Sequence, residues 1–219
     1  MNISIQNTSD GSQTLYSEQF NETYHSVNGA VTESLHVFID TGFMVTTKSD
    51  LQIFEVGFGT GLNALLTLQR ARKLNRNVSY HAIELFPVSS EVFEKLDYAS
   101  FTSNDTEFFG TMHRAPWNAE VRLTPNFVLT KVNGNLLNYN HPVMYDLVYF
   151  DAFSPAIQPE LWSEDIFRKI YAHMNPNGIL TTYCAKGAVR RTLQQVGFTT
   201  ERLPGSPGKR EMLRATKHQ

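Results

Sequence analysis

Cysteine is almost absent from this chain of 219 residues, which contains only Cys184. A single cysteine cannot form a disulfide within the chain, and any metal site would have to use histidines and carboxylates. The seven histidines are scattered and show no HExxH motif or comparable ligand spacing. The sequence therefore predicts neither a disulfide framework nor a metal centre.

Long apolar runs are also absent. No stretch approaches the roughly 20 apolar residues that a membrane-spanning helix requires, and the N-terminal residues lack the basic and apolar zones of a signal peptide. The composition, 41% hydrophobic and 18% charged, is that of a soluble globular protein. These features predict a cytoplasmic protein of one ordinary-sized domain with no membrane partner.

Basic residues are concentrated near the end of the sequence. Between residues 186 and 217 there are eight lysines and arginines against two glutamates, whereas the whole chain has a formal net charge of −2. A basic end on an otherwise acidic chain favours a polyanionic partner that binds through one face. A solvated basic surface would show the same pattern, so the charge alone leaves both interpretations open.

Strand-like and helix-like segments alternate along most of the chain. Extended or strand structure is predicted for residues 14–20, 51–56, 78–85, 127–132, 145–150, 179–184, 198–203 and 211–215. Helices are predicted for residues 30–40, 62–74, 162–174 and 188–196, with a turn at the NPNG sequence of residues 175–178. This order predicts an α/β fold with a doubly wound, mostly parallel seven-stranded sheet. The last two strands would form its antiparallel C-terminal edge.

The sequence FEVGFGTGLN, residues 54–63, follows a predicted strand and precedes a predicted helix. Gly57, Gly59 and Gly61 allow positive φ angles and let a ligand lie against bare backbone at the positive end of a helix dipole. Their spacing differs from the Gly-x-Gly-x-x-Gly that binds the pyrophosphate of a dinucleotide. Glu55, two residues before Gly57, would repel a pyrophosphate but attract an ammonium or sulfonium. We therefore expect S-adenosylmethionine as the ligand, unless the turn is purely structural.

Two further carboxylates follow predicted strands. Glu84 ends the strand after the glycine turn, where an acid can accept hydrogen bonds from both hydroxyls of a ribose. Asp151 ends a later strand at the same edge of the sheet, where a carboxylate can accept a hydrogen bond from an amine nucleophile beside a methyl donor. The alternative is that Glu84 is a solvated strand end and that Asp151 caps its loop.

Three segments are informative together. They are EVGFGTGLNALL (55–66), DAFSPAIQPELWSEDIF (151–167) and AKGAVRRTLQQVGF with PGKREML (within 185–213). They resemble the methyltransferase domain of the tRNA-modifying MnmC proteins and their stand-alone, MnmD-like relatives. The likeness extends from about residue 15 to residue 215.

The resemblance implies a class I, Rossmann-like methyltransferase. It would transfer the methyl group of S-adenosylmethionine to the exocyclic amine of 5-aminomethyl-2-thiouridine at the tRNA wobble position, giving 5-methylaminomethyl-2-thiouridine. Residues 1–48 would form an N-terminal lead-in segment that packs over the donor pocket, and residues 49–219 the methyltransferase domain. No FAD and no metal would be required.

The resemblance also implies roles for individual residues. Asp151 would be catalytic and contact the amine. The donor would be bound by Tyr24, Ser26, Glu55, Gly57, Phe58, Gly59, Gly61, Asn63, Glu84 and Asn135. The tRNA would be bound by Lys186, Arg190, Arg191, Lys209 and Arg210.

The sequence departs from the family pattern in two respects. Asn135 stands where the family commonly has an acid that contacts the adenine amino group. An amide carbonyl accepts that hydrogen bond more weakly than a carboxylate does. The flavin-dependent oxidase half of the bifunctional proteins is not matched in this sequence. The resemblance therefore implies that a separate protein or pathway supplies the aminomethyl substrate.

Three other functions are compatible with parts of the sequence. A methyltransferase or aminopropyltransferase acting on a small-molecule amine is disfavoured by the basic C-terminal region. A non-catalytic tRNA-binding protein is disfavoured by the intact glycine turn and its carboxylates. A nicotinamide dehydrogenase is disfavoured by the glycine spacing.

Overall fold

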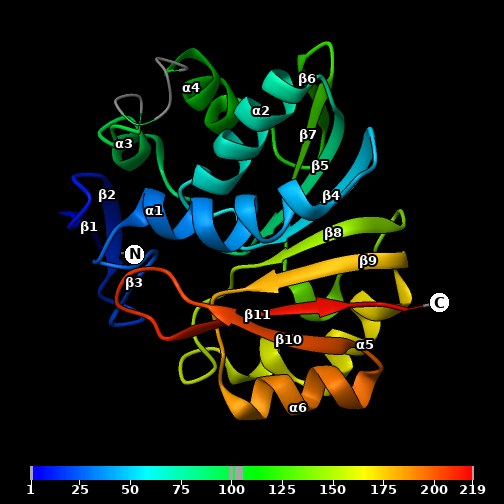
Figure 1. Cartoon of the computed structure of the whole chain (residues 1–219). Helices are drawn as coiled ribbons and strands as arrows, with labels where there is room; N and C mark the ends of the chain where they lie inside the picture. Colours follow the sequence, from blue (N-terminus) through cyan, green and yellow to red (C-terminus); the bar gives the residue numbers. More distant parts are fainter. Residues whose placement is uncertain (1, 99–100, 102–105, 219) are drawn as a thin grey trace.

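The computed structural model describes residues 2–98, 101 and 106–218. Within these residues, eight strands form one mixed sheet through the middle of the molecule (Figure 1). In spatial order they are β10 (Thr199–Pro204), β11 (Glu211–Thr216), β9 (Met174–Thr182), β8 (Tyr145–Phe150), β4 (Asp50–Val56), β5 (Asn77–Glu84), β7 (Phe127–Asn133) and β6 (Glu120–Thr124). The pairings from β9 through β7 are parallel, and β11 is antiparallel to both of its neighbours. The predicted fold class and its antiparallel C-terminal edge are confirmed.

The eighth strand was not predicted. β6 pairs antiparallel with β7 and forms the other edge of the sheet. Its sequence, EVRLT, is short and carries two charged side chains, which is typical of an edge strand that avoids further pairing. Such a strand has too weak an apolar signal to be recognised without its partner.

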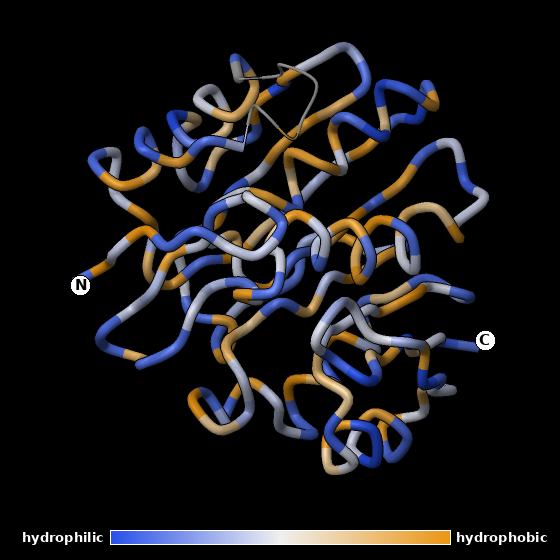
Figure 2. Tube along the Cα trace, turned by 60° about the vertical axis from the view of Figure 1, so that its left-hand side comes forward, coloured by the Kyte–Doolittle hydropathy of each residue, from blue (hydrophilic) through white to orange (hydrophobic). Residues whose placement is uncertain are grey.

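Helices cover both faces of the sheet. On one face lie α1 (Ala30–Ser34), a π-helix that continues it (Leu35–Asp40), α2 (Leu62–Leu74) and α4 (Thr106–Arg114), and on the other lie α5 (Glu164–Ala172) and α6 (Gly187–Val196) (Figure 1). A short helix, α3 (Ser90–Phe93), precedes α4. Hydrophobic and hydrophilic residues alternate along the helical turns in Figure 2, as expected of helices that pack on a sheet with one face. None of the described helices is long and apolar enough to cross a membrane.

The sheet separates two hydrophobic cores. Neighbouring residues of β4, Ile53 and Phe54, belong to different cores, and so do Leu147 and Val148 of β8. Each of these four side chains is fully buried. Because both faces of the central strands are covered, these strands are continuous apolar runs in the sequence.

The lead-in segment forms a small unit before β4. Its strands, β1 (Ile3–Asn7), β2 (Gln13–Ser17) and β3 (Glu22–Thr23), make an antiparallel sheet. The loop after β1 caps α1, because the side chains of Thr8, Asp10 and Ser12 accept hydrogen bonds from the first three N–H groups of that helix. These bonds replace an ordinary N-cap, which Gly29 cannot provide.

The turn predicted at residues 175–178 was wrong, because these residues lie within β9. Asn177 adopts a left-handed conformation with a φ of 63°. The register of β9 against β8 shifts at this point, so the NPNG residues form an irregularity inside the strand.

The strand order reverses at the centre of the sheet. From β4 the chain proceeds through α2 to β5 and β7 on one side, and from β8 it proceeds through α5 to β9 on the other. Ligands of open α/β sheets bind outside the carboxyl ends of the strands at such a switch point. The loops that follow β4, β5 and β8 meet there.

Candidate functional site

The turn between β4 and α2 presents bare backbone at the carboxyl end of the sheet. Gly57, Gly59 and Gly61 have φ angles of 89°, 49° and 72°, which are left-handed values. A Cβ atom on Gly57 would lie 2.7 Å from the carbonyl oxygen of Asp151, and one on Gly59 would lie 3.1 Å from the ring of Tyr24. Side chains are excluded here because the loop after β8 and the lead-in segment pack directly on the turn.

Glu84, at the end of β5, is hydrogen-bonded to the same turn. Its Oε2 accepts the N–H of Gly59 at 2.9 Å, and its Oε1 accepts the N–H of Phe86 at 2.8 Å. Burial raises the pKa of Glu84, although these backbone donors oppose the shift. The carboxyl group also lines the cavity described below, where its remaining lone pairs can accept further hydrogen bonds.

The side chain of Asn63, in the first turn of α2, joins two carboxylates. Its Nδ2 donates to Glu55 Oε1 at 3.0 Å and to Asp151 Oδ2 at 2.8 Å. Glu55 is fully buried, and this burial raises its pKa well above the usual range. The hydrogen bond from Asn63 and the hydroxyl of Tyr80 oppose this shift, whereas the charge of Asp151 adds to it.

Asp151 follows β8, and its N–H donates to the carbonyl oxygen of Val56 at 3.0 Å. Burial raises the pKa of Asp151 to about 7, and the charge of Glu33 acts in the same direction. Asn63 and Lys209 oppose the shift. The charge of this carboxyl group therefore changes near neutral pH, where a group involved in proton transfer is most effective.

These groups line a cavity of about 340 Å³, a volume within the range of small-molecule sites. Its described lining includes one lysine, Lys209, and five carboxyl groups, those of Glu22, Glu33, Glu84, Asp151 and Glu160. An excess of acidic groups in a partly enclosed site repels a phosphate and attracts a cation. The cavity therefore suits a positively charged ligand.

The lead-in segment closes one side of the cavity. Tyr24 and Ser26 are part of the lining, and the ring of Tyr24 packs edge-on against Phe153 at a centroid distance of 5.1 Å. Phe20 contacts Phe153 at 4.7 Å and Phe86 at 5.5 Å. Aromatic side chains of the lead-in segment thus meet the loops that follow β5 and β8, and such rings can stack on a nucleic-acid base.

The structure gathers most of the predicted donor-binding residues around this cavity. The lining contains Tyr24, Ser26, Gly57, Phe58, Gly59, Asn63, Glu84 and Asn135, together with Asp151. Glu55 lies behind Asn63, and Gly61 is packed against Phe58 at the start of α2. The Oδ1 of Asn135 accepts the N–H of Leu137 at 2.9 Å, which makes it the cap of a short 3-10 helix, Leu136–Asn138.

The predicted tRNA-binding residues differ in their exposure. Lys186, Arg191 and Arg210 are exposed, whereas Arg190 is partly buried on α6. Lys209 lines the cavity and is also partly exposed. Three of the five predicted residues are thus exposed and two are partly buried.

Other basic residues of the C-terminal region are bound within the protein. Arg202 pairs with Glu211, and Arg214 pairs with Glu201. The Nζ of Lys217 donates to two backbone carbonyl groups near the start of β9. Part of the basic excess seen in the sequence is therefore neutralised or held by internal contacts.

Sequence reasoning missed several residues of the cavity, among them Glu33 and Tyr183. Glu33 is only 5% exposed, and a signal for it was present because it lies at helical spacing from the buried residues Ala30 and Val37. An acid on the apolar face of a helix needs a buried partner. Tyr183 follows β9, and its local sequence does not distinguish it from other aromatic residues near strands.

Comparisons with known proteins bear on this site. A family model described as S-adenosyl-L-methionine-dependent methyltransferase matches residues 98–218. The tRNA 5-methylaminomethyl-2-thiouridine biosynthesis bifunctional protein MnmC of Actinobacillus pleuropneumoniae serotype 5b is 30% identical over 234 residues, and that of Pseudomonas entomophila is 25% identical over 224 residues. These alignments cover 96% and 90% of this chain but 34% and 33% of the relatives. The chain thus spans about a third of the length of these curated relatives.

Solved structures show the same fold. The crystal structure of MNMC2 from Aquifex aeolicus matches with a TM-score of 0.82 at 24% identity, covering 100% of this chain and 71% of that chain. Spermidine synthase from Thermotoga maritima matches with a TM-score of 0.60 at 11% identity, covering 99% and 80%. The two structures share the mixed sheet and its flanking helices with this chain.

Proposed function

Because this chain belongs to a family of S-adenosyl-L-methionine-dependent methyltransferases, we propose that it methylates the wobble uridine of tRNA. The methyl group would pass to the exocyclic amine of 5-aminomethyl-2-thiouridine and give 5-methylaminomethyl-2-thiouridine. The acidic cavity at the switch point of the sheet is the observation on which the proposal rests. It combines a site for a cationic donor with a carboxyl group that titrates near neutral pH.

The residues of the cavity fit the methyl donor. S-adenosyl-L-methionine supplies a methyl group on a positively charged sulfur atom, and it also carries an ammonium group. The glycine turn offers backbone that no Cβ atom covers, and the surrounding carboxylates offset positive charge. We propose that the donor is held by Tyr24, Ser26, Glu55, Gly57, Phe58, Gly59, Gly61, Asn63, Glu84 and Asn135.

Two of these residues act indirectly in this proposal. Glu55 is fully buried behind Asn63, so it orients the Asn63 amide and does not touch the donor itself. Gly61 immediately precedes α2, where it lets Phe58 and the helix approach each other closely. Both residues shape the turn that receives the donor.

Asp151 is the proposed catalytic residue. An amine attacks through its lone pair, so it must be neutral and close to the methyl carbon. An ionised Asp151 accepts a hydrogen bond from the amine, orients the lone pair and stabilises the ammonium that forms. Since a cation lowers the pKa of a neighbouring carboxyl group, donor binding favours this ionised form.

The acceptor is inferred from the relatives, whose names specify 5-methylaminomethyl-2-thiouridine biosynthesis in tRNA. We propose that residues 1–48 cover the donor site and that residues 49–219 form the catalytic domain. The exposed residues Lys186, Arg191 and Arg210 would contact the tRNA backbone.

A labelling experiment tests the proposed function. The protein is incubated with S-adenosyl-L-methionine carrying a labelled methyl group and with bulk tRNA that has 5-aminomethyl-2-thiouridine, and the tRNA is digested to nucleosides. Label is expected in 5-methylaminomethyl-2-thiouridine alone. Label in another nucleoside, or in none, would contradict the proposal, and a parallel reaction with putrescine tests for a small-amine acceptor.

A further inference from the structure

The loop between β10 and β11, residues 205–210, reaches across to the lead-in segment (Figure 1). At its start, the Nε2 of His36 lies 2.7 Å from the carbonyl oxygen of Pro204. At its tip, a Cβ atom on Gly208 would lie 2.0 Å from the side-chain nitrogen of Asn28. The loop is therefore packed closely against two parts of the lead-in segment.

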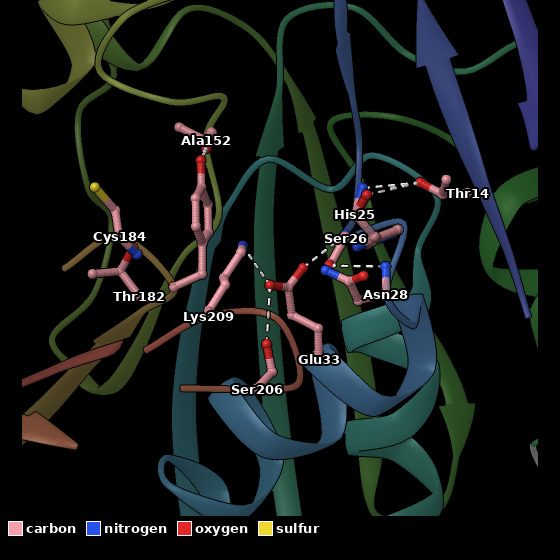
Figure 3. Close-up of polar contacts among 11 residues, drawn as sticks. Thr14, His25, Ser26, Asn28, Glu33, Ala152, Thr182, Cys184, Ser206 and Lys209 are labelled. Atoms are coloured by element: carbon pink, nitrogen blue, oxygen red, sulfur yellow. Dashed lines mark hydrogen bonds and ion pairs between the residues drawn. The ribbon is translucent and has the colours of Figure 1, made fainter. Parts of the chain in front are cut away.

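Glu33 joins this loop to the lead-in segment at the cavity (Figure 3). Its Oε2 accepts the N–H of Ser26 at 2.8 Å. Its Oε1 lies 2.5 Å from the Nζ of Lys209 and accepts a hydrogen bond from the hydroxyl of Ser206 at 3.4 Å. Glu33 is buried, whereas about 32% of the Lys209 side chain remains exposed. A buried carboxylate of this kind requires the partners that the loop provides.

Lys209 also contacts the segment beside Asp151. Its Nζ lies 4.2 Å from the centre of the Tyr183 ring, an arrangement that favours a cation. The hydroxyl of Tyr183 in turn donates to the carbonyl oxygen of Ala152 at 2.9 Å, one residue after Asp151. The lysine is thus held at the cavity by a carboxylate on one side and an aromatic ring on the other.

We propose that Lys209 and Glu33 form a charge pair whose lysine favours the ionised form of Asp151, so that Asp151 can accept a hydrogen bond from the acceptor amine. This role rests on the proposed function. Both residues are positioning residues, because they act on the reaction through Asp151. Lys209 is assigned here to the methyl-transfer site and not to the tRNA-binding surface.

The charges around Asp151 explain why a lysine is needed to favour its ionised form. The groups that face it from the surrounding elements are Glu55 of β4, Tyr80 of β5, Asn63 of α2, Glu33 of α1, Tyr183 after β9 and Lys209 of the loop. Glu33 raises the pKa of Asp151 and Lys209 lowers it. Without the lysine, repulsion from the neighbouring carboxylates would raise the pKa of Asp151 further, and the protonated form would predominate at neutral pH.

A purely structural role for the pair has a different consequence. If Lys209 and Glu33 only fixed the loop, removing either residue would break the same ion pair, and both changes would affect Asp151 alike. If the charges of Lys209 and Glu33 act on Asp151, the two substitutions shift its pKa in opposite directions. The direction of the effect therefore separates the two roles.

A carboxyl-carbon NMR titration of the unliganded protein measures whether each variant raises or lowers the pKa of Asp151. The protein is labelled with carbon-13 at aspartate, and the Asp151 signal is assigned from its loss in Asp151→Asn. Lys209→Gln is expected to raise the pKa of Asp151 by about one unit and Glu33→Gln to lower it by a similar amount. The double variant is expected to return it close to the wild-type value.

Controls keep the test independent of folding. Lys209→Arg retains the cation and is expected to leave the titration unchanged, whereas Lys73→Gln removes an exposed charge near the far end of α2 and is expected to have no effect. If the Glu33 variants do not fold, the contrast between Lys209→Gln and Lys209→Arg remains. Shifts in the same direction, a shift in only one of the two glutamine variants, or no shift would overturn the proposal.

The pH dependence of methylation gives a second readout. The acidic limb of the rate profile should move to higher pH in Lys209→Gln and to lower pH in Glu33→Gln. A wild-type protein that does not methylate tRNA would contradict the proposed function, although the NMR titration would still test the charge pair. An active wild type whose Asp151 titration is insensitive to both variants would refute the charge pair alone.

Discussion

Asn63 contributes to the charge state of the carboxyl groups at the cavity. Its single amide nitrogen donates to both Glu55 and Asp151. Two carboxyl groups that share a donor in a buried site cannot both ionise at low cost, because their like charges repel. The position of Asn63 in the first turn of α2 adds the positive end of the helix dipole, which favours one negative charge there. The ionisation of Asp151 thus depends on several residues at once.

Replacing Asp151 by asparagine should separate catalysis from donor binding. Asp151→Asn retains the shape of the side chain but removes its charge, so methylation should slow by about a hundredfold or more. Donor affinity, measured by calorimetry, should fall much less than the rate, because the charge of Asp151 is only one of several that attract the cationic donor. Asp165→Asn, an exposed carboxylate on α5, is the matched control and should keep the wild-type rate. Equal losses of affinity and rate in Asp151→Asn would make Asp151 a donor-binding residue.

The same carboxyl group should affect stability in a pH-dependent way. Burial raises the pKa of Asp151 from roughly 3.9 to about 7 in the folded protein. A raised pKa favours the folded state below the unfolded value, and that contribution is lost as the pH rises through the folded value. The free energy of unfolding of Asp151→Asn, relative to wild type, should therefore increase between about pH 4 and pH 7, by on the order of 4 kcal/mol.

Urea denaturation of the unliganded proteins at several pH values measures this difference. Asp165→Asn should show no such trend, because its side chain is exposed. A difference between Asp151→Asn and wild type that is constant with pH would show that Asp151 titrates with its ordinary pKa.

At the scale of elements, α1 depends on a segment that is distant in sequence. Its first N–H groups are capped by the loop after β1, and Asp10 is the charged acceptor of that loop. Although partial burial raises the pKa of Asp10, hydrogen bonds from Ser12, Thr8 and Thr32 hold it well below its usual range. The loop thus fixes the start of the helix that places Glu33 at the cavity.

Removing this cap should destabilise the protein. Asp10→Ala leaves N–H and hydroxyl donors without their acceptor, which should cost about 1–2 kcal/mol of unfolding free energy. Urea denaturation at neutral pH measures the loss. Asp40→Ala removes an exposed carboxylate at the other end of the same helical segment and should change stability by less than about 0.5 kcal/mol. Equal effects of the two changes would contradict the capping role.

At the scale of the whole molecule, the switch point places three loops at one site, and the C-terminal pair of strands adds a fourth contribution. The loops after β4, β5 and β8 come from parallel strands and meet because their carboxyl ends share one edge. The loop between β10 and β11 reaches the site because β11 runs antiparallel to β9. The antiparallel edge thus brings Lys209 to the cavity.

The exposed basic residues should contribute to tRNA binding by pairing with phosphate groups. The double variant Lys186→Ala/Arg191→Ala should weaken binding, and the slope of log affinity against log salt should fall by about one for each phosphate that is no longer bound. Binding titrations at several salt concentrations measure both quantities. Lys73→Ala/Lys95→Ala removes two exposed lysines outside the C-terminal region and is the matched control. Unchanged affinity and slope in the first variant would exclude these residues from the interface.

The sequence by itself determined the alternation of strands and helices, the glycine turn after β4 and the positions of Glu84 and Asp151 at strand ends. These features depend on local rules, because side-chain periodicity and the φ angles open to glycine act over a few residues. Local rules did not predict strand structure that depends on hydrogen bonding to a neighbouring strand. β6 is recognisable only beside β7, and the NPNG sequence is held in β9 by its neighbours.

Only the tertiary structure decided which side chains meet. Asn63 joins Glu55 to Asp151, and Lys209 pairs with Glu33 although the two residues come from opposite ends of the chain. Such contacts depend on how whole elements pack, and burial then sets the charge of each carboxyl group. Tertiary packing also separated the basic residues of the C-terminal region, for which the sequence favoured a polyanionic partner. Some of its charges remain at the surface, and one lies at the cavity.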